Sequence, residues 1–367
     1  MGGLSGGPKA NKANTPRSEL VQQWHVSSMF NTKAKDIEDL WDLYIHRPSA
    51  YVLLRILLSL PTWAHLTPNG ITFCSLGLGW AGAAVASEGF MGALFPISIS
   101  SLLRLDLFQL RILSSFLIFL SAVCDCADGQ LARATGTGSS WGKFLDGFCD
   151  VLVITGNFVF LTVALMYHYG LWGLILGVSA SVAVQQGSNF YDKIKSCYCI
   201  VTGMPDADEI RSSVDCATLS KELRLATERG DQSRQDLFLM KFAMWYAQGL
   251  KLDEELKVLE KDRHPVSIED RRVTMRIVSF FGPGLQTGIF YVALFVSAFW
   301  DGGLLAYGVF MGVGEHAFRY YAYTRAVEHK LTAQKQFFQF DLFIPVLAIA
   351  IALYIAMVFG YMPLKSA

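Results

Sequence analysis

Charged residues are scarce in this chain. Only 17% of its 367 residues are charged, whereas 52% are hydrophobic, and the formal net charge is zero. In soluble globular proteins about a quarter of all residues are charged, so this composition indicates a membrane protein. A balanced charge gives no electrostatic attraction for nucleic acid, and we expect no nucleic-acid partner.

The chain also lacks the patterns of a thiolate metal site and of a secretory signal. Its seven cysteines form no C-x2-C pair and are not accompanied by a histidine cluster, so we interpret them as buried or cytosolic thiols. Residues 1–35 contain no apolar run of useful length and are expected to form a disordered tail. No solenoid-type repeat is present.

The charges that do occur in apolar sequence are concentrated in one motif. Residues 125–150 have the pattern D-x2-D-G-x2-A-R-x8-G-x3-D-x3-D, whose fixed positions are Asp125, Asp128, Gly129, Ala132, Arg133, Gly142, Asp146 and Asp150. An ionisable side chain within a membrane segment costs about 2.5–3.5 kcal/mol on insertion scales and is usually functional. This concentration of carboxylates therefore indicates a site.

The spacing of the motif predicts two acidic helix faces. Asp125 and Asp128 share one face of a helix, and Asp146 and Asp150 share one face of another. A short turn at residues 135–140 would let the four carboxylates point to a common centre. Oxygen ligands favour hard cations such as Mg²⁺, Mn²⁺ or Ca²⁺, and four carboxylates suffice for a metal pair that clamps a phosphoryl group.

At every defined position this motif resembles the signature of the CDP-alcohol phosphotransferases. The segment Thr67-Pro68-Asn69-Gly70-Ile71-Thr72 also resembles the start of that family's first core helix, and the helical layout extends the resemblance loosely over residues 48–190 and 273–325. The resemblance implies an integral membrane enzyme of phospholipid synthesis. Such an enzyme transfers a substituted phosphate from a CDP-linked donor to an alcohol acceptor and releases CMP. It also implies a homodimer.

The resemblance further implies a role for each site residue. A pair of Mg²⁺ or Mn²⁺ ions would be held by Asp125, Asp128 and Asp146, and Asp150 would act as general base while also contacting a metal. The CDP-binding surface would consist of Asn69, Thr72, Asp128, Gly129, Ala132, Arg133 and Gly142. Two alternatives stay open: Arg133 as an anchor at the membrane interface, and Asn69 and Thr72 as capping and packing residues.

Further polar residues lie in the apolar C-terminal third. Glu315, His316 and Arg319 are interpreted either as a site for the acceptor or a lipid phosphate, or as a pair at i, i+4 that stabilises helix packing. Arg276 begins another span with Arg271 and Arg272, and the three are either interface anchors or a phosphate site.

Hydrophobic periodicity predicts an all-α, polytopic transmembrane bundle of about six to seven spans. The spans are expected at residues 67–88, 107–131, 139–166, 170–187, 275–298, 303–323 and 340–361, with residues 89–104 unassigned. The corresponding domains are a tail (1–35), amphipathic juxtamembrane helices (36–66), a membrane core (67–187), a soluble helical insert (188–272) and C-terminal spans (273–362).

The distribution of Lys and Arg predicts the topology. Residues 188–272 and 324–337 are rich in them, whereas the turns at 167–170 and 299–303 contain none. By the positive-inside rule, the insert and the motif turn face the cytoplasm. The partners expected are therefore membrane lipids, a CDP-linked donor and an alcohol acceptor.

The motif leaves the direction of transfer open. Phosphatidyl transfer from CDP-diacylglycerol to an inositol- or glycerol-like alcohol is favoured slightly, because the Gly136–Ser140 turn resembles those of such enzymes. The alternative transfers the headgroup of CDP-ethanolamine or CDP-choline to diacylglycerol. A cation transporter is a more distant alternative, since its acidic groups would be spread across the membrane rather than clustered at one turn.

Overall fold

The computed structural model of the chain describes residues 37–59, 66–88, 98–135, 137–204, 215–230, 233–250, 257–259 and 266–333. Within these ranges every regular element is a helix and none is a strand, which confirms the predicted all-α class. The elements before residue 204 are η2 (Asp42–His46), α3 (Arg47–Ser59), α4 (Pro68–Ala86), α6 (Ile99–Leu103), α7 (Leu107–Thr135) and α8 (Ser140–Val201). Those after it are α10 (Cys216–Arg229), α11 (Arg234–Leu250), α13 (Ile268–Val278), η4 (Ser279–Phe281), α14 (Pro283–Phe299), α15 (Gly303–Val309), η5 (Phe310–Gly314) and α16 (Glu315–Glu328).

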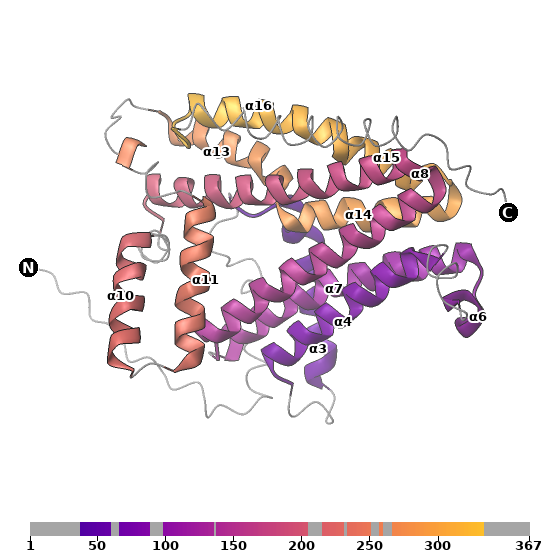
Figure 1. The fold of residues 1–367 in the computed structure, drawn as a ribbon, viewed down its shortest axis with the longest axis horizontal. Coiled ribbons are helices and arrows are strands. Elements are labelled where there is room, and N and C mark those ends of the chain that lie inside the picture. Colours follow the sequence, from indigo (N-terminus) through magenta and orange to yellow (C-terminus); the bar gives the residue numbers. More distant parts are fainter. Residues whose placement is uncertain are drawn as a thin grey trace, which may run out of the picture.

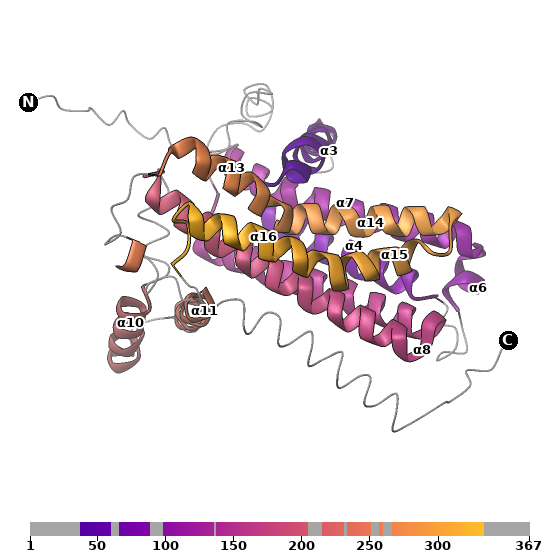
Figure 2. The ribbon, with the colours of Figure 1, turned by 90° about the horizontal axis from the view of Figure 1, so that it is seen from above.

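The long helices run along the longest axis of the molecule (Figure 1). The central one is α7, which contacts α4 and α14 along its length. The α10–α11 pair lies across one end of this bundle, the end at which α7 finishes and α8 begins. Figure 2 shows that α3 and the α10–α11 pair occupy opposite sides of the bundle.

Two of the described helices, Leu107–Thr135 and Trp141–Val201, are long and apolar enough to cross a membrane. A third candidate is the pair Ile268–Phe281 and Pro283–Phe299, which is bent by 44°. These helices and the composition indicate an integral membrane protein, while the number of spans stays a prediction. The expected tail at 1–35 and the expected span at 340–361 lie outside the described residues, and of the unassigned segment 89–104 only the short α6 and its flanks are described.

The chain reverses its direction within α8. Gly170 has φ 60° and ψ −138°, outside the helical region and in the half of the map that glycine tolerates best. A Cβ added to Gly177 would lie 2.5 Å from the Cα of Thr162, although fifteen residues of straight helix span about 22 Å. The two halves of α8 therefore pack against each other. The second half continues to Val201, past the boundary expected at residue 188.

Small and hydroxylated residues hold α4 close to α7. The hydroxyl of Ser75 donates to the carbonyl of Ser121 at 2.9 Å, and that of Ser121 donates back to the carbonyl of Ser75 at 2.8 Å. Ser114 donates to the carbonyl of Gly82 at 2.7 Å. Such interhelical hydrogen bonds between small residues are typical of helix packing in membranes, and they fix the register of α4 against the acidic end of α7.

Two capping residues set the starts of α4 and α8. The side chain of Thr67 accepts a hydrogen bond from the backbone N–H of Gly70, with Pro68 in the first turn, as the sequence predicts. The side chain of Ser139 accepts from the N–H of Gly142 at 2.9 Å. Both helices therefore begin at defined residues beside the end of α7.

The N-terminal helices and the insert flank this core. Ala50 and Leu54 of α3 are buried against α7 in a cluster with Val123, whereas Val52 and Ile56 are exposed. In the insert, α10 has no buried residue, and α11 packs on α8 through Phe242 and Phe144. The amphipathic character predicted for the N-terminal region suits the two faces of α3, while its place at a membrane surface stays a prediction.

Candidate active site

The residues of the motif meet at the end of α7 and the start of α8, where α4 also begins. They border a cavity of about 390 Å³, within the range of small-molecule sites. Its lining consists of Pro68, Asn69, Thr72, Asp128, Gly129, Ala132, Arg133, Thr137, Gly138, Ser139, Gly142, Lys143 and Asp146. The structure thus brings together all the residues predicted for CDP binding.

The four aspartates form one continuous group beside this cavity. Asp125, Asp128 and Asp146 each offer a carboxylate oxygen, and these oxygens lie within 4.8 Å of one another. Asp150 is in hydrogen-bond contact with Asp125, and Asp146 is in contact with Asp128. Asp128 and Asp146 line the cavity. Asp125 lies one helical turn before Asp128 in α7, and Asp150 lies one turn after Asp146 in α8.

This donor set fits a divalent cation. Carboxylates in direct contact repel each other unless a proton or a cation lies between them. Only oxygen atoms are offered by the three clustered aspartates, and Mg²⁺ and Mn²⁺ prefer such ligands. The hydroxyl of Thr72 donates to Oδ2 of the buried Asp128, so α4 orients one of these carboxylates.

Two glycines shape the cavity next to the carboxylates. A Cβ at Gly129 would lie 3.3 Å from Nη1 of Arg133, so the guanidinium folds back over this glycine. A Cβ at Gly142 would lie 3.5 Å from Oδ1 of Asn69, so the amide of α4 rests on the first turn of α8. The cation and the amide are therefore held on opposite helices beside the carboxylates.

The comparisons with known proteins agree with this geometry. The family model described as CDP-alcohol phosphatidyltransferase matches residues 65–196, from the start of α4 into the second half of α8. The chain carries a CDP-alcohol phosphatidyltransferase domain. The family consists of transferases of substituted phosphate groups and is generally dependent on divalent metals. No curated protein and no solved structure matches the chain.

Several residues that line the cavity of the CDP-alcohol phosphatidyltransferase domain were not predicted. They are Pro68, Thr137, Gly138, Ser139 and Lys143. Their position in the sequence is the one feature that could have indicated them. Lys143 follows a fixed glycine of the motif, and the others adjoin Asn69 or form the turn between the two acidic helices. Because the signature leaves those positions variable, the pattern alone does not select them.

The second predicted cluster lies outside this cavity. Glu315 and Arg319 are buried, with Nη2 of Arg319 3.7 Å from Oε2 of Glu315, so the predicted i, i+4 pair is present. Arg319 also donates to Oε1 of Gln186 at 2.8 Å, and lies 2.8 Å from Nδ1 of His316. These contacts tie α16 to α8 and favour the packing interpretation. A role for His316 and Arg319 in binding the acceptor stays a prediction.

The arginines before α14 are dispersed rather than clustered on one ligand. Arg276 donates to the carbonyl of Glu38 at 3.3 Å, which links α13 to the N-terminal segment. Arg271 donates to the carbonyl of His329 at 3.3 Å, and Arg272 pairs with Glu269 at 2.9 Å. None of the three lines the 390 Å³ cavity.

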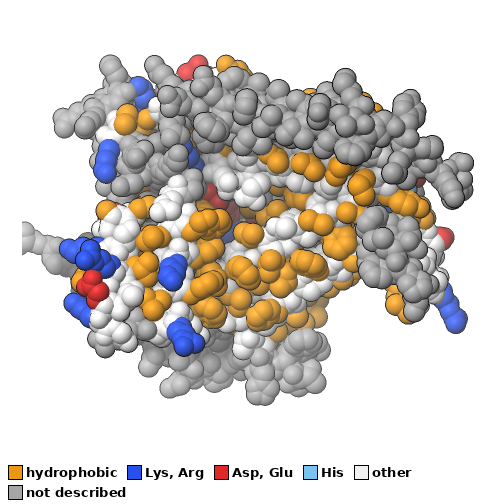
Figure 3. Space-filling view, in the orientation of Figure 1, with side chains coloured by type: hydrophobic (Ala, Val, Ile, Leu, Met, Phe, Trp, Pro, Cys, Tyr) orange, Lys and Arg blue, Asp and Glu red, His pale blue; other side chains and the backbone are white. Residues whose placement is uncertain are grey.

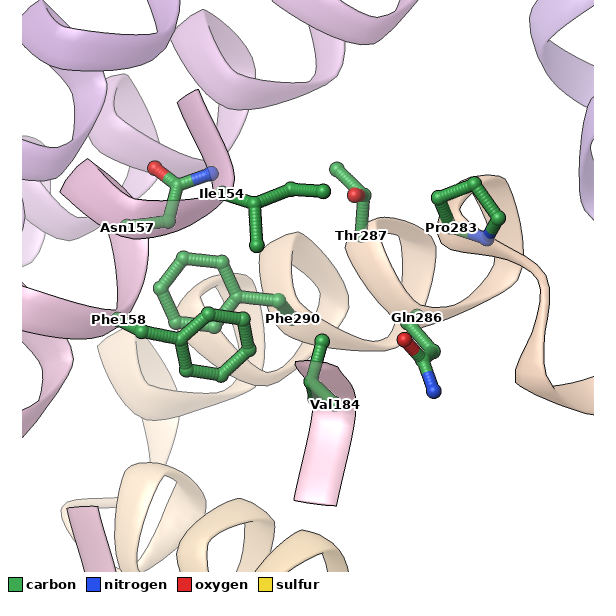
Figure 4. A pocket seen from close by; sticks show the side chains of 8 residues that line it. All are labelled: Ile154, Asn157, Phe158, Val184, Pro283, Gln286, Thr287 and Phe290. Atoms are coloured by element: carbon green, nitrogen blue, oxygen red, sulfur yellow. The ribbon is translucent and has the colours of Figure 1, made fainter. Parts of the chain in front are cut away.

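A smaller cavity lies between α8 and α14 (Figure 4). Its volume of about 10 Å³ is that of a single water molecule. Asn157 and Gln286 are buried among its lining residues, and neither Oδ1 of Asn157 nor Nε2 of Gln286 has a hydrogen-bond partner. The amides therefore suit one bound water, two turns beyond Asp150 on the same helix.

Sequence reasoning missed a buried network at the N-terminus. Nδ1 of His46 lies 2.7 Å from Oδ1 of Asp42, and Sγ of Cys126 lies 4.0 Å from the same oxygen. The indole of Trp41 donates to the hydroxyl of Tyr291 at 2.5 Å, which in turn is 3.4 Å from Nε2 of His46. This network joins η2 to α7 and α14.

Asp39 joins this network, since its Oδ1 accepts from the backbone N–H of Asp42 at 2.8 Å, and the pKa values of the two carboxyl groups shift in opposite directions. Burial, followed by the charge of Asp42, raises the pKa of Asp39 to about 8. Burial also acts to raise the pKa of Asp42, but the hydrogen bond and charge of His46 outweigh it and hold that pKa below its usual value. Asp39 therefore keeps its proton at neutral pH while Asp42 is ionised.

Proposed function

We propose that the protein transfers the phosphatidyl group of CDP-diacylglycerol to a polar alcohol, inositol- or glycerol-like, and releases CMP. The observation that carries this proposal is the 390 Å³ cavity, which joins the residues expected to bind CDP to a group of touching aspartates. A family match over residues 65–196 supports a CDP-linked donor and an alcohol acceptor.

The donor would lie in the cavity between α4 and α7. The Arg133 guanidinium, folded over Gly129, is suited to a phosphate because its donors form a planar fork. Asn69 and the turn at residues 137–139 line the same cavity and can hydrogen-bond the ribose or the phosphates. Gly129 and Gly142 allow Arg133 and Asn69 to lie against the two helix walls, where both can contact the nucleotide.

The reaction exchanges one phosphorus–oxygen bond for another. The acceptor oxygen bonds to the phosphorus that carries the diacylglycerol group, and the bond from that phosphorus to the oxygen of CMP breaks. CMP leaves with the electron pair, and the proton of the hydroxyl passes to the carboxylate of Asp150. A bound pair of Mg²⁺ or Mn²⁺ ions, held by Asp125, Asp128, Asp146 and Asp150, would neutralise charge on the pyrophosphate.

The remaining work of the protein is positioning. The hydroxyl of Thr72 fixes Asp128, and the contact of Asp150 with Asp125 fixes the base relative to α7. Transfers of this kind depend on alignment and charge stabilisation more than on a protein nucleophile. A carboxylate that is held in one place can therefore serve as base although its intrinsic basicity is low.

The charge distribution supports a cytoplasmic location of this site. The α10–α11 pair lies at the same end of the bundle as the start of α8 (Figure 1). Lys and Arg are abundant in residues 188–272, the part of the sequence that contains this pair. CDP-linked donors would thus be reached from the cytoplasmic leaflet. The homodimer implied by the resemblance stays a prediction.

Release of CMP by the purified full-length protein tests the proposal. The assay takes a panel of CDP donors with polar alcohols or diacylglycerol, in the presence of Mg²⁺ or Mn²⁺, and mass spectrometry identifies the lipid product. We expect release with CDP-diacylglycerol plus a polyol. Release only with CDP-ethanolamine or CDP-choline plus diacylglycerol would reverse the direction, and no release with any donor would refute the proposal.

A further inference from the structure

Helix α11 contacts two parts of α8 that are far apart in the sequence. The ring of Phe242 meets that of Phe144 edge to face, with centroids 5.0 Å apart, at the start of α8. The hydroxyl of Tyr246 donates to Oδ2 of Asp192 at 3.2 Å, near the end of α8. Since α11 bridges both ends of the α8 hairpin, it is a docked part of the membrane-spanning unit rather than a loosely tethered lobe.

The outward side of α11 combines aromatic and basic residues. Positions i, i+4, i+7, i+11 and i+14 fall along one line of a helix, and here they are Arg234, Phe238, Lys241, Trp245 and Gln248, all exposed. We name these five residues the α11 stripe. Phe238 is 51% exposed and Trp245 is 64% exposed, which is unusual for such large apolar side chains in a region bathed by water.

The neighbouring α10 has the opposite character. None of its residues is buried, and Lys221, Arg224 and Glu228 are all exposed. Nε of Arg224 pairs with Oε1 of Glu228 at 2.8 Å along the helix. In Figure 1, α10 lies beyond α11 at the end of the bundle. The pair therefore divides into a water-facing helix and a helix with an apolar, basic outer side.

The α11 stripe is continuous with the apolar exterior of α8. The ring of Phe238 meets that of Phe144 at 5.1 Å, and Phe144 stacks with Phe148 at 5.9 Å. Phe148 and Val151 of α8 are themselves 42% and 45% exposed. Figure 3 shows this face: hydrophobic side chains with Lys or Arg among them over α11, and a hydrophobic surface continuing over α8.

We propose that the α11 stripe is a membrane-binding surface, which takes up anionic phospholipids of the cytoplasmic leaflet. Phe238 and Trp245 enter the upper acyl region, as aromatic residues do at membrane interfaces. Arg234 and Lys241 bind the phosphates, since a helix with cations beside Trp and Phe is suited to an anionic interface. This stripe contains no acidic residue to oppose that charge. Helix α11 is then interfacial, in contrast to the soluble insert expected over residues 188–272.

The first test locates Trp245 relative to the bilayer. The full-length protein is reconstituted in nanodiscs of phosphatidylcholine brominated in the upper acyl chain, and tryptophan fluorescence is measured. The chain has eight tryptophans, so the contribution of Trp245 is the difference between wild type and Trp245→Phe. We expect bromine to quench it and aqueous acrylamide to leave it unchanged. Quenching by acrylamide and not by bromine would overturn the proposal.

The second test addresses the lipid charge. The readout is the ratio of Trp245 quenching by brominated phosphatidylglycerol to that by brominated phosphatidylcholine at equal mole fraction. We expect this enrichment to fall about fivefold or more in Arg234→Glu/Lys241→Glu. The matched control is Lys221→Glu/Arg224→Glu on α10, which makes the same charge change and should retain the enrichment. An equal fall in both variants, or no enrichment in the wild type, would contradict binding by the α11 stripe.

Discussion

Two groups of potential metal ligands flank α7, and their surroundings differ. Asp125, Asp128 and Asp146 form one group, and Asp42, His46 and Cys126 form the other; in each, the ligand atoms lie within 4.8 Å of one another. The first group adjoins a 390 Å³ cavity, and its carboxylates face further carboxylates. In the second, hydrogen bonds from protein groups already satisfy the polar atoms. Proximity of ligand atoms alone therefore does not distinguish a metal site from a structural network.

The start of α14 closes the second group. A Cβ on Gly284 would lie 2.1 Å from Oδ1 of Asp42, and one on Gly282 would lie 2.7 Å from Oδ2 of Asp39. Asp39 also accepts from the backbone N–H of Leu285. Glycine permits this close approach, so peptide groups occupy the space that a ligand would need. The second group is a joint between the N-terminal helix and α14.

Removal of divalent ions should have the largest effect and should separate the two groups. Chelation is expected to abolish CMP release, and Mg²⁺ or Mn²⁺ should restore it, because the touching aspartates need a cation between them. His46→Gln should show the same metal concentration for half-maximal activity as the wild type. A shift of that concentration in His46→Gln would mean that the N-terminal group binds metal as well.

Asp150→Asn should reduce the turnover number by about 10³-fold. The variant keeps the size of the side chain but removes the base, and general base catalysis contributes about 10²–10⁴-fold. The measurement is kcat for CMP release at saturating metal. Asp301→Asn is the control, because that carboxylate is 92% exposed at the opposite end of α7 and pairs with Arg111. Full activity of Asp150→Asn would exclude the proposed role.

His46→Ala should destabilise the fold by about 3 kcal/mol. It removes the fully buried partner of Asp42, whose own side chain is 28% exposed. Breaking a buried charged pair costs about 3–5 kcal/mol, and the partial exposure of Asp42 places this pair at the lower end. Thermal or denaturant unfolding in detergent gives the comparison. Tyr44→Ala alters the same helix at a position that is 68% exposed and should change stability by less than about 0.5 kcal/mol. Similar losses in both variants would argue against the network as a joint.

The pH dependence of stability should reveal the protonation of Asp39. Its pKa is about 8 in the folded protein against 3.8 for the free group, so between these values the folded state binds more protons than the unfolded state. Stability should then fall as pH rises through this window. Asp39→Asn should flatten the decline of the unfolding midpoint between pH 5 and pH 8. An unchanged slope would show that this carboxyl does not retain its proton.

Much of the candidate site could be predicted because it depends on local helical geometry. The spacing of Asp125 with Asp128, and of Asp146 with Asp150, places each pair on one face whatever the tertiary structure. The cap at Thr67 likewise follows from its neighbours Pro68 and Gly70. Asn69 and Thr72 reach the cavity because small residues hold α4 close to α7. This packing of two helices is tertiary structure, which a single sequence indicates only weakly.

The N-terminal network could not be predicted, because its register is not that of an α-helix. Residues Asp42–His46 form a π-helical turn, which shifts every following side chain relative to a period of 3.6. Leu40 and Tyr44, two large residues of the expected amphipathic segment 36–66, are exposed. The opposite side, with Asp39 and His46, docks onto α14, an element more than two hundred residues away. Only the tertiary structure reveals that contact.

The two caps that begin α4 and α8 have an electrostatic consequence for the cavity. Pro68 and Asn69, at the N-terminus of α4, and Ser139 and Gly142, at that of α8, all line it. Helix N-termini carry a partial positive charge and unpaired N–H groups, which attract phosphates. The C-terminal end of α7 contributes the opposite partial charge, and Arg133 in its last turn offsets it. The peptide backbone therefore supplies a field that favours a pyrophosphate in this cavity, next to the aspartates that would hold its metal ions.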